Sequence, residues 1–154
     1  MIKYTIGNVL HSDADVILHQ VNCKGKMGAG LALQIKNKYP FVYKQYSFFC
    51  SQAEDSSSLL GQVLFIPINN RQCIANLFAQ DGYASYGFTT HRMTEYSKLR
   101  MCLETVNKKY KGRKVALPYL LGCGLAGGDW NIVEKIIKEE LKDCDVEIVS
   151  LKEI

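Results

Sequence analysis

The sequence predicts an α/β fold, a three-layer α/β/α sandwich in which helices cover both faces of a mixed, mostly parallel sheet. Three observations lead to this prediction. Strand-like and helix-like segments alternate along most of the chain, which is typical of βαβ units. The segment 16–22 (VILHQVN) is apolar enough for a strand buried on both faces, as in parallel sheets. Two glycine-rich loops each follow a predicted strand and precede a predicted helix.

The first half of the chain supplies strands, two helices and a hairpin. Pro40 separates the two helices because proline disfavours helical backbone at the residue before it. An Asn-Asn turn joins the last two strands into a hairpin. The predicted elements are the strands 2–6 and 16–22, the helices 29–39 and 41–50, the surface loop 51–58 and the strands 61–67 and 72–78.

The second half repeats the alternation after an aromatic-rich loop over residues 79–88. Apolar residues at helical spacing, from Met93 to Val106, predict a long helix that packs on the sheet. The same spacing recurs from Ile132 to Leu141. The predicted elements are the helix 90–110, the strand 114–118, the loop 121–130, the helix that follows it and the strand 145–151.

Composition narrows the class of protein. With 154 residues, 47% of them apolar, the chain fits a single soluble domain spanning 1–154. The start lacks the features of a signal peptide and no apolar run reaches the length of a membrane span, so we expect a cytoplasmic protein without membrane contact. Six cysteines without a CxxC pair argue against a disulfide framework and against a zinc site. The net charge of +4 is too small and dispersed to predict a nucleic-acid-binding surface.

The two glycine loops are the strongest functional signal. The first, 22–31 (NCKGKMGAGL), follows strand 16–22, and the second, 122–128 (GCGLAGG), follows strand 114–118. Glycine allows a ligand to approach the backbone closely, and free N–H groups at a helix start attract anions. Loops at the carboxyl ends of neighbouring parallel strands lie side by side. We therefore expect the loops to cradle the two phosphates of one diphosphate, the alternative being tight turns that need glycine for their geometry alone.

The second loop also fits a dinucleotide-binding pattern. Gly122, Gly124 and Gly127 satisfy GxGxxG, and Glu147 follows about 20 residues later. The pattern nevertheless comes near the end of the chain, whereas a Rossmann domain usually opens with it. An NAD-binding oxidoreductase is therefore a minor alternative. A P-loop is excluded because neither loop ends in GlyLys(Ser/Thr).

The segments VILHQVNCKGKMGAGLALQIKNKYP and ALPYLLGCGLAGGDW together resemble a macrodomain, the ADP-ribose-binding fold. In particular, they resemble the branch that includes terminal ADP-ribose protein glycohydrolase, ADP-ribose 1″-phosphate phosphatase and DNA ADP-ribosyl glycohydrolases. The resemblance implies that ADP-ribose, or a derivative attached to protein or nucleic acid, binds in a cleft across the top of the sheet, without a metal or other cofactor. The ligand-binding residues that it implies are Asn8, Asn22, Gly28, Ala29, Gly30, Leu31, Gly122, Cys123, Gly124, Leu125, Ala126 and Gly127.

At three positions the chain departs from the patterns of this family. Many macrodomains have an aspartate after the first strand that accepts a hydrogen bond from the adenine amino group, and Asn8 stands there. Its amide oxygen can accept the same bond without charge assistance, or can serve as a turn residue or helix cap. The lysine and aspartate that do the chemistry in terminal ADP-ribose protein glycohydrolase fall at Gln80 and Ala126, so a lysyl intermediate cannot form there.

His19 and Asp81 are the candidate catalytic residues. A neutral imidazole near the distal ribose can orient water or protonate a leaving oxygen, and a carboxylate on a cleft-side loop can activate water. The alternatives are a buried structural histidine bonded to backbone and an ordinary Asp-Gly turn. Lys24 and Lys26 are positioned to draw a phosphate toward the first loop, unless they are solvated surface lysines.

Aromatic and thiol side chains complete the candidates. Tyr83, Tyr86 and Phe88 are candidates to cover the distal ribose or to stack on a base, and equally well to anchor their own loop to the domain. Cys23 and Cys123 lie in the two glycine loops, where packing as small residues is favoured over a nucleophilic role. The leading functional hypothesis is a metal-independent hydrolase that removes phosphate, an ADP-ribosyl adduct or an acyl group at the distal ribose of ADP-ribose. The main alternative is a non-catalytic ADP-ribose reader.

Overall fold

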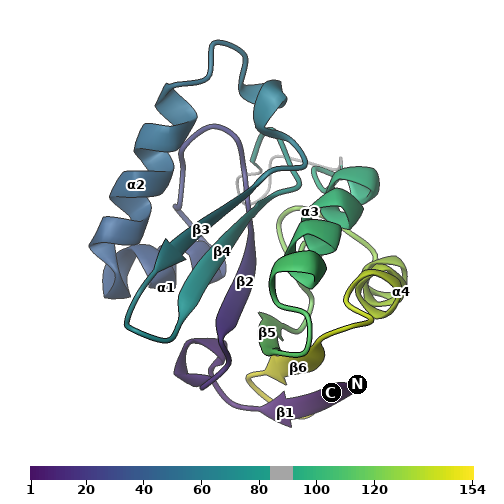
Figure 1. Cartoon of the computed structure of the whole chain (residues 1–154). Coiled ribbons are helices and arrows are strands. Elements are labelled where there is room, and N and C mark those ends of the chain that lie inside the picture. The colour runs from purple at the N-terminus through teal and green to yellow at the C-terminus, as the bar shows by residue number, and fades with distance from the viewer. Residues whose placement is uncertain (84–91) are drawn as a thin grey trace.

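The computed structural model describes residues 1–83 and 92–154, which form a six-stranded sheet between two layers of helices (Figure 1). Two short 3-10 helices, Val9–His11 and Ser56–Leu59, lie in connections. The strands are β1 (Ile2–Ile6), β2 (Val16–Val21), β3 (Val63–Pro67), β4 (Cys73–Phe78), β5 (Lys114–Pro118) and β6 (Asp145–Ser150), and the α-helices are α1 (Gly30–Lys38), α2 (Pro40–Ser51), α3 (Tyr96–Lys109) and α4 (Trp130–Glu140).

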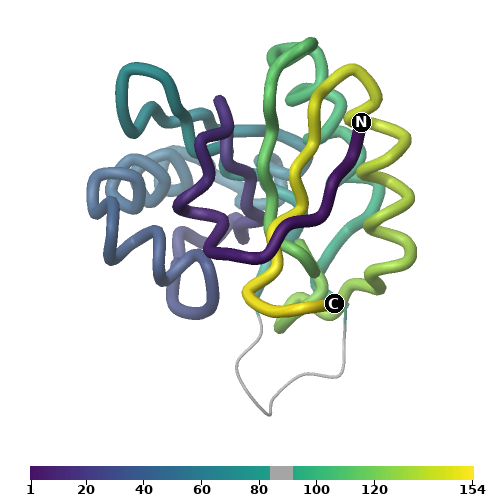
Figure 2. The backbone as a smooth tube through the Cα atoms, turned by 90° about the horizontal axis from the view of Figure 1, so that it is seen from below, coloured from purple at the N-terminus to yellow at the C-terminus, as the bar shows by residue number. Residues whose placement is uncertain are grey.

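The sheet is mixed and mostly parallel, as the sequence predicts. Its strand order is β1-β6-β5-β2-β4-β3. Neighbouring strands are parallel except β3 and β4, which form the predicted antiparallel hairpin. Helices α1 and α2 cover one face of the sheet, while α3 and α4 cover the other (Figures 1 and 2). The predicted three-layer fold class is therefore confirmed.

Strand β2 lies inside the sheet and contributes to the core on both faces. Val16 and Leu18 pack in the cluster that α3 and α4 complete. Ile17 and Val21 pack in the cluster beneath α1 and α2. Because successive side chains of a strand point to opposite faces, a run of apolar residues is what this position requires.

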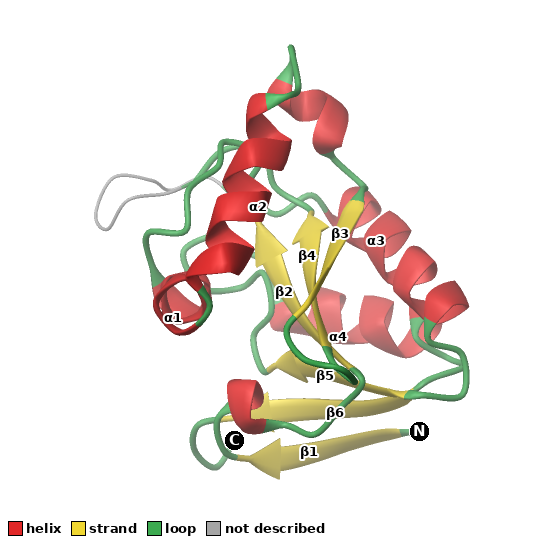
Figure 3. Ribbon diagram, turned by 60° about the vertical axis from the view of Figure 1, so that its left-hand side comes forward, coloured by secondary structure: helices red, strands yellow, loops and turns green. Residues whose placement is uncertain are grey.

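The topology creates a crevice between β2 and β5, which are adjacent in the sheet. The chain leaves β2 for α1 on one face and leaves β5 for α4 on the other, as Figure 3 shows from the side. In open α/β sheets, ligands bind at such a switch point, outside the carboxyl ends of the strands. Both glycine loops lie in these two connections.

Two local predictions were wrong. The helix predicted over 90–110 begins at Tyr96, because the backbone N–H groups of Met93 and Thr94 donate to the carbonyl oxygen of Ala126 instead of entering a helix. The segment 51–58, predicted as a loop, ends in the start of a 3-10 helix that Asp55 caps. In the part of the chain that the structure describes, no helix combines the length and the apolar composition needed to cross a membrane.

Candidate functional site

A continuous groove runs along the carboxyl edge of the sheet. It consists of three cavities of about 420, 370 and 390 Å³, which we call the Tyr83 cavity, the central cavity and the Asn8 cavity. Ala29 and Leu125 line both the Tyr83 cavity and the central cavity. Gly30 and Leu31 line both the central cavity and the Asn8 cavity. Neighbouring cavities thus share wall residues and lie next to one another along this edge.

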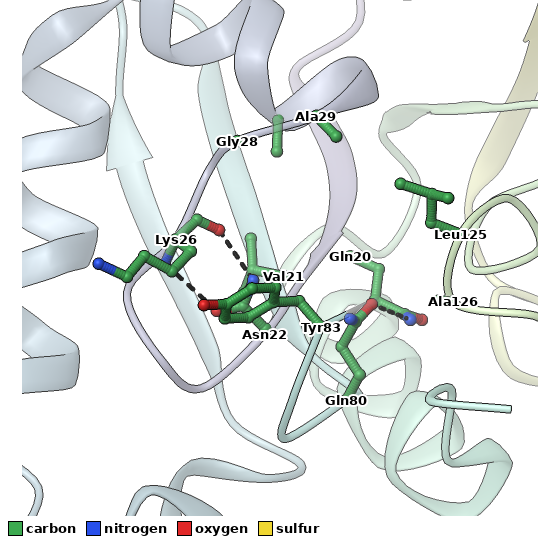
Figure 4. Close-up of a pocket in the computed structure, with 11 residues that line it drawn as sticks. Gln20, Val21, Asn22, Lys26, Gly28, Ala29, Gln80, Tyr83, Leu125 and Ala126 are labelled. Atoms are coloured by element: carbon green, nitrogen blue, oxygen red, sulfur yellow. Dashed lines mark hydrogen bonds between the residues drawn. The ribbon is translucent and has the colours of Figure 1, made fainter. Parts of the chain in front are cut away.

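The first glycine loop is held by the side chain with which it begins. Asn22 is buried, and its Oδ1 accepts from the backbone N–H groups of Lys24 and Lys26 at 3.0 and 3.3 Å. Its Nδ2 donates to the carbonyl oxygen of Lys26 at 2.8 Å (Figure 4). From helix α2, the Tyr46 hydroxyl lies 2.6 Å from the Asn22 carbonyl oxygen and 2.8 Å from its Oδ1. Asn22 therefore sets the loop conformation and also lines the Tyr83 cavity.

The second glycine loop is held from behind by a different segment. The carbonyl oxygen of Gly122 accepts from the Gly128 N–H at 2.9 Å and from the Thr94 hydroxyl at 2.6 Å. Gly122 has a φ of +72°, and a Cβ there would lie 2.7 Å from the Oε1 of Gln20. Glycine is therefore required at this position both for its backbone conformation and for space.

Both loops offer backbone N–H groups to the groove. Across residues 1–83 and 92–154, the N–H groups of Gly124, Leu125 and Ala126 have no hydrogen-bond acceptor. Helix α1 starts at Gly30 on the opposite wall, and its cap residue, Ala29, has no capping side chain. Unsatisfied N–H groups and the positive end of a helix dipole attract anions. The central cavity is therefore suited to phosphate groups.

His19 faces the α1 side of the sheet and lines the central cavity. It is buried, and its Nε2 lies 2.6 Å from the Oδ1 of Asn76 on β4. The amide of Asn76 is oriented by its Nδ2, which donates to the Leu64 carbonyl oxygen, so Nε2 of His19 carries the proton. Nδ1 is buried without a partner in the described residues. Burial lowers the pKa of His19 to about 4, which keeps the imidazole neutral at pH 7.

Asp81 does not line any of the three cavities. Its Oδ1 accepts from the Ser56 hydroxyl at 2.7 Å and lies 3.4 Å from the Nζ of Lys24. Its backbone carbonyl accepts from the Cys23 N–H at 2.9 Å. The structure thus places this candidate in an ion pair beside the first loop, and its catalytic role stays a hypothesis.

Asn8 serves as a helix cap, the alternative role that the sequence suggested, and it also lines the groove. Its Oδ1 accepts from the Leu10 N–H at 2.9 Å and caps the 3-10 helix that follows, while the residue lines the Asn8 cavity. Glu147, the acidic residue of the dinucleotide pattern, accepts a hydrogen bond from Ser12 and lines none of the cavities.

Most of the other predicted ligand-binding residues line the groove, but two do not. Cys123 and Gly127 are absent from the walls of the three cavities. Burial raises the pKa of the Cys123 thiol to about 11 and that of the Cys23 thiol to about 12, which disfavours a nucleophilic role for either. Those that do line it are Asn22, Gly28, Ala29, Gly30, Leu31, Tyr83, Gly122, Gly124, Leu125 and Ala126. Tyr86 and Phe88 lie outside the described residues.

Two glutamines are among the lining residues that the sequence analysis did not identify as ligand contacts. Gln20 and Gln80 line both the Tyr83 cavity and the central cavity, and the Nε2 of Gln20 donates to the Oε1 of Gln80 at 2.8 Å (Figure 4). The available signal was a glutamine at or just beyond the carboxyl end of a largely apolar strand. Lys26 also lines the Tyr83 cavity but turns its amine away from it (Figure 4). The described residues contain no group of three or more His, Cys, Asp or Glu side chains arranged to hold a metal ion.

Comparison with known proteins gives consistent matches. The family model described as Macro domain matches residues 18–137. The ADP-ribose 1″-phosphate phosphatase of Saccharomyces cerevisiae is 32% identical over 176 residues, covering 97% of this chain and 98% of that protein. The DNA ADP-ribosyl glycohydrolase of Mycobacterium tuberculosis is 28% identical and matches 96% of this chain. This chain spans 42% of the length of the mycobacterial relative.

Solved structures agree with the sequence matches. A Bacteroides thetaiotaomicron protein of unknown function is 30% identical, with a TM-score of 0.82 and 98% of each chain covered. The macrodomain of the Mycobacterium tuberculosis relative is 27% identical, with a TM-score of 0.75 and 97% of each chain covered. The family model covers most of the chain, and both loops that it spans line the groove. The chain therefore belongs to the macrodomain family.

Proposed function

We propose that this protein binds ADP-ribose derivatives along the groove and hydrolyses them at the distal ribose, with ADP-ribose 1″-phosphate as the favoured substrate. The observation that supports the proposal is the central cavity, which is lined both by the start of helix α1 and by residues 124–126, whose N–H groups have no acceptor among the described residues. A diphosphate placed there would direct adenosine toward the Asn8 cavity and the distal ribose toward the Tyr83 cavity. The naming of related proteins as ADP-ribose 1″-phosphate phosphatases points to the same ligand.

The polar groups of the Tyr83 cavity favour a phosphate ester as substrate. Gln20, Asn22 and Gln80 contribute carboxamides, and Tyr83 contributes a phenol. These groups orient water and hydroxyl groups but do not take up a proton at neutral pH. Phosphoryl transfer depends mainly on positioning and on electrostatic stabilisation, so it suits such a site better than a reaction that needs a strong base.

The proposed reaction consumes one water for each phosphate released. Water attacks phosphorus, the bond between phosphorus and the 1″ oxygen breaks, and the departing ribose oxygen gains a proton. The products are ADP-ribose and inorganic phosphate. The carboxamides would hold water and ribose in place, and the loop N–H groups would fix the diphosphate.

A non-catalytic reader is the second candidate. It is favoured by Gln80 and Ala126, which stand where the resemblance to terminal ADP-ribose protein glycohydrolase implies the catalytic lysine and aspartate. A reader would use the same groove and the same loops, so binding alone does not separate the two functions.

The test is calorimetry followed by a turnover assay. We expect ADP-ribose to bind without added metal and more tightly than AMP, because AMP lacks the second phosphate and the distal ribose. We expect release of inorganic phosphate from ADP-ribose 1″-phosphate. Equal affinities for AMP and ADP-ribose would contradict the proposed binding mode. Tight ADP-ribose binding without turnover of phosphorylated, acylated or macromolecular derivatives would favour the reader.

A further inference from the structure

Thr94 lies directly behind the second glycine loop, outside the loops that the sequence singled out. Its side chain is completely buried. Its hydroxyl lies 2.6 Å from the Gly122 carbonyl oxygen and 2.8 Å from the Nε2 of Gln20. Thr94 therefore connects the end of strand β2 to the start of the second loop.

The direction of each hydrogen bond in this chain of contacts is determined. The Nε2 of Gln80 donates to the Gly82 carbonyl oxygen at 2.8 Å, so the Oε1 of Gln80 faces Gln20. Gln20 then donates one amide proton to Gln80 and the other to Thr94. A hydroxyl has a single proton, and that of Thr94 goes to Gly122 because a carbonyl oxygen only accepts. The Oε1 of Gln20 is left without a partner in the described part of the chain.

The same short segment also holds the far side of the loop. The backbone N–H groups of Met93 and Thr94 donate to the Ala126 carbonyl oxygen at 2.7 and 3.1 Å. The loop is thus fixed at Gly122 and at Ala126. Between these two points lie Gly124, Leu125 and the N–H group of Ala126, in the part of the loop that lines the central cavity.

We propose that Thr94 and Gln20 are positioning residues that hold the second loop in its ligand-binding conformation. Neither the glycines nor the loop N–H groups select that conformation alone, because glycine populates many backbone conformations. The hydroxyl of Thr94 selects it by fixing the Gly122 carbonyl oxygen. This inference rests on the proposed function, since it assigns the diphosphate to the second loop.

The test compares Thr94→Val with Thr94→Ser. Valine keeps the shape of threonine but removes the hydroxyl and leaves Gly122 and Gln20 each short of a partner, whereas serine keeps both bonds. We expect Thr94→Val to weaken ADP-ribose binding about tenfold or more and Thr94→Ser to stay within about threefold of wild type. Thr105→Val is the matched control, because it makes the same threonine-to-valine change on the exposed surface of α3. It should leave ADP-ribose affinity unchanged.

Melting temperature and affinity must be measured on the same preparations. A merely structural role would lower the melting temperature of Thr94→Val but leave the affinity of the folded protein unchanged, and that result would overturn the inference. If Thr94→Val does not fold, Thr94→Ala removes the same hydroxyl from Gly122 without adding a methyl group, and unchanged ADP-ribose affinity in that variant would also overturn the inference. Failure of the wild-type protein to bind ADP-ribose would instead contradict the proposed function.

Discussion

The two glycine loops face the same groove but are held in different ways. In the first loop, the side chain of Asn22 bonds to backbone groups two and four residues further along the chain. In the second loop, the Gly122 carbonyl oxygen accepts from the Gly128 N–H within the loop, but the side chain that holds it is Thr94, which lies 28 residues earlier. The first loop thus largely carries its own support, whereas the second relies on a segment from another part of the sequence.

This difference predicts how each loop responds to substitution. A loop held mainly by one of its own side chains should lose stability and binding together when that side chain is removed. A loop held from behind should tolerate added atoms on its ligand-facing surface without unfolding, and should then lose binding alone. Substitutions in the two loops can therefore separate binding from folding.

The largest effect is expected for Gly124→Val in the second loop. A Cβ at Gly124 would have no atom within 4 Å, so the fold has room for the new side chain. The isopropyl group would then occupy the groove, since Gly124 lines the central cavity. We expect ADP-ribose affinity to fall roughly 100-fold or more by calorimetry, with melting temperature nearly unchanged. Gly124→Ala is the graded control and should lose much less; a folded Gly124→Val protein with normal affinity would contradict the assignment of the phosphate site to this loop.

The next effect concerns the first loop. Asn22→Ala removes the acceptor of the Lys24 and Lys26 N–H groups and the donor to the Lys26 carbonyl oxygen. We expect a loss of about 2–3 kcal/mol in the free energy of unfolding, measured by urea denaturation, and weaker ADP-ribose binding at the same time. Tyr46→Phe removes only the hydroxyl that contacts Asn22 from helix α2 and should cost about 1 kcal/mol. An Asn22→Ala protein as stable as wild type would show that the loop does not need this support.

His19 precedes Gln20 in strand β2, and its titration predicts how the stability of the protein depends on pH. Its pKa is about 4 in the folded protein and near 6.5 in the unfolded chain, so the unfolded state takes up the proton first as pH falls. Stability contributed by the neutral ring is therefore lost as pH decreases from about 6.5 toward 4. Between pH 7.5 and pH 5 we expect wild type to lose about 2 kcal/mol more than His19→Gln, measured by denaturation at both pH values.

The same variant tests whether His19 has a catalytic role. If the ring transfers a proton, turnover of ADP-ribose 1″-phosphate should fall roughly 10² to 10⁴-fold while ADP-ribose still binds. A normal rate per folded molecule would assign the histidine a structural role. Equal pH dependence of the two proteins would show that burial does not lower the pKa of His19 as the structure indicates.

The sequence predicted those features that are determined by residues close together in the chain. The glycine loops were found because a strand, glycines and a helix start are adjacent in the chain. The face on which His19 lies follows from strand alternation. Its partner Asn76 does not, because that contact depends on the register between β2 and β4.

Contacts between distant segments account for the misses. The bond between Gln20 and Thr94 joins residues 74 positions apart, and no local pattern indicates it. The predicted helix start was wrong for the same reason, since residues 93 and 94 bond to Ala126 in the second loop. The first loop, with its own side-chain support, was therefore the more predictable of the two.

The smallest effect is expected for Asp81, beside the first loop. Its carboxylate pairs with Lys24, and both side chains are partly exposed to solvent, so the pair should contribute less than about 1 kcal/mol to stability.

Asp81→Asn and Lys24→Ala break the same ion pair, but only the first removes the carboxylate. If the pair merely supports the loop, both variants should bind ADP-ribose and turn over substrate within about twofold of wild type, because Asn22 still holds the backbone. If instead the carboxylate activates water, turnover should fall roughly 10²-fold or more in Asp81→Asn and stay normal in Lys24→Ala. Single-turnover rates of the two variants, measured on the same substrate, therefore decide whether this edge of the first loop is part of the catalytic apparatus or only of its support.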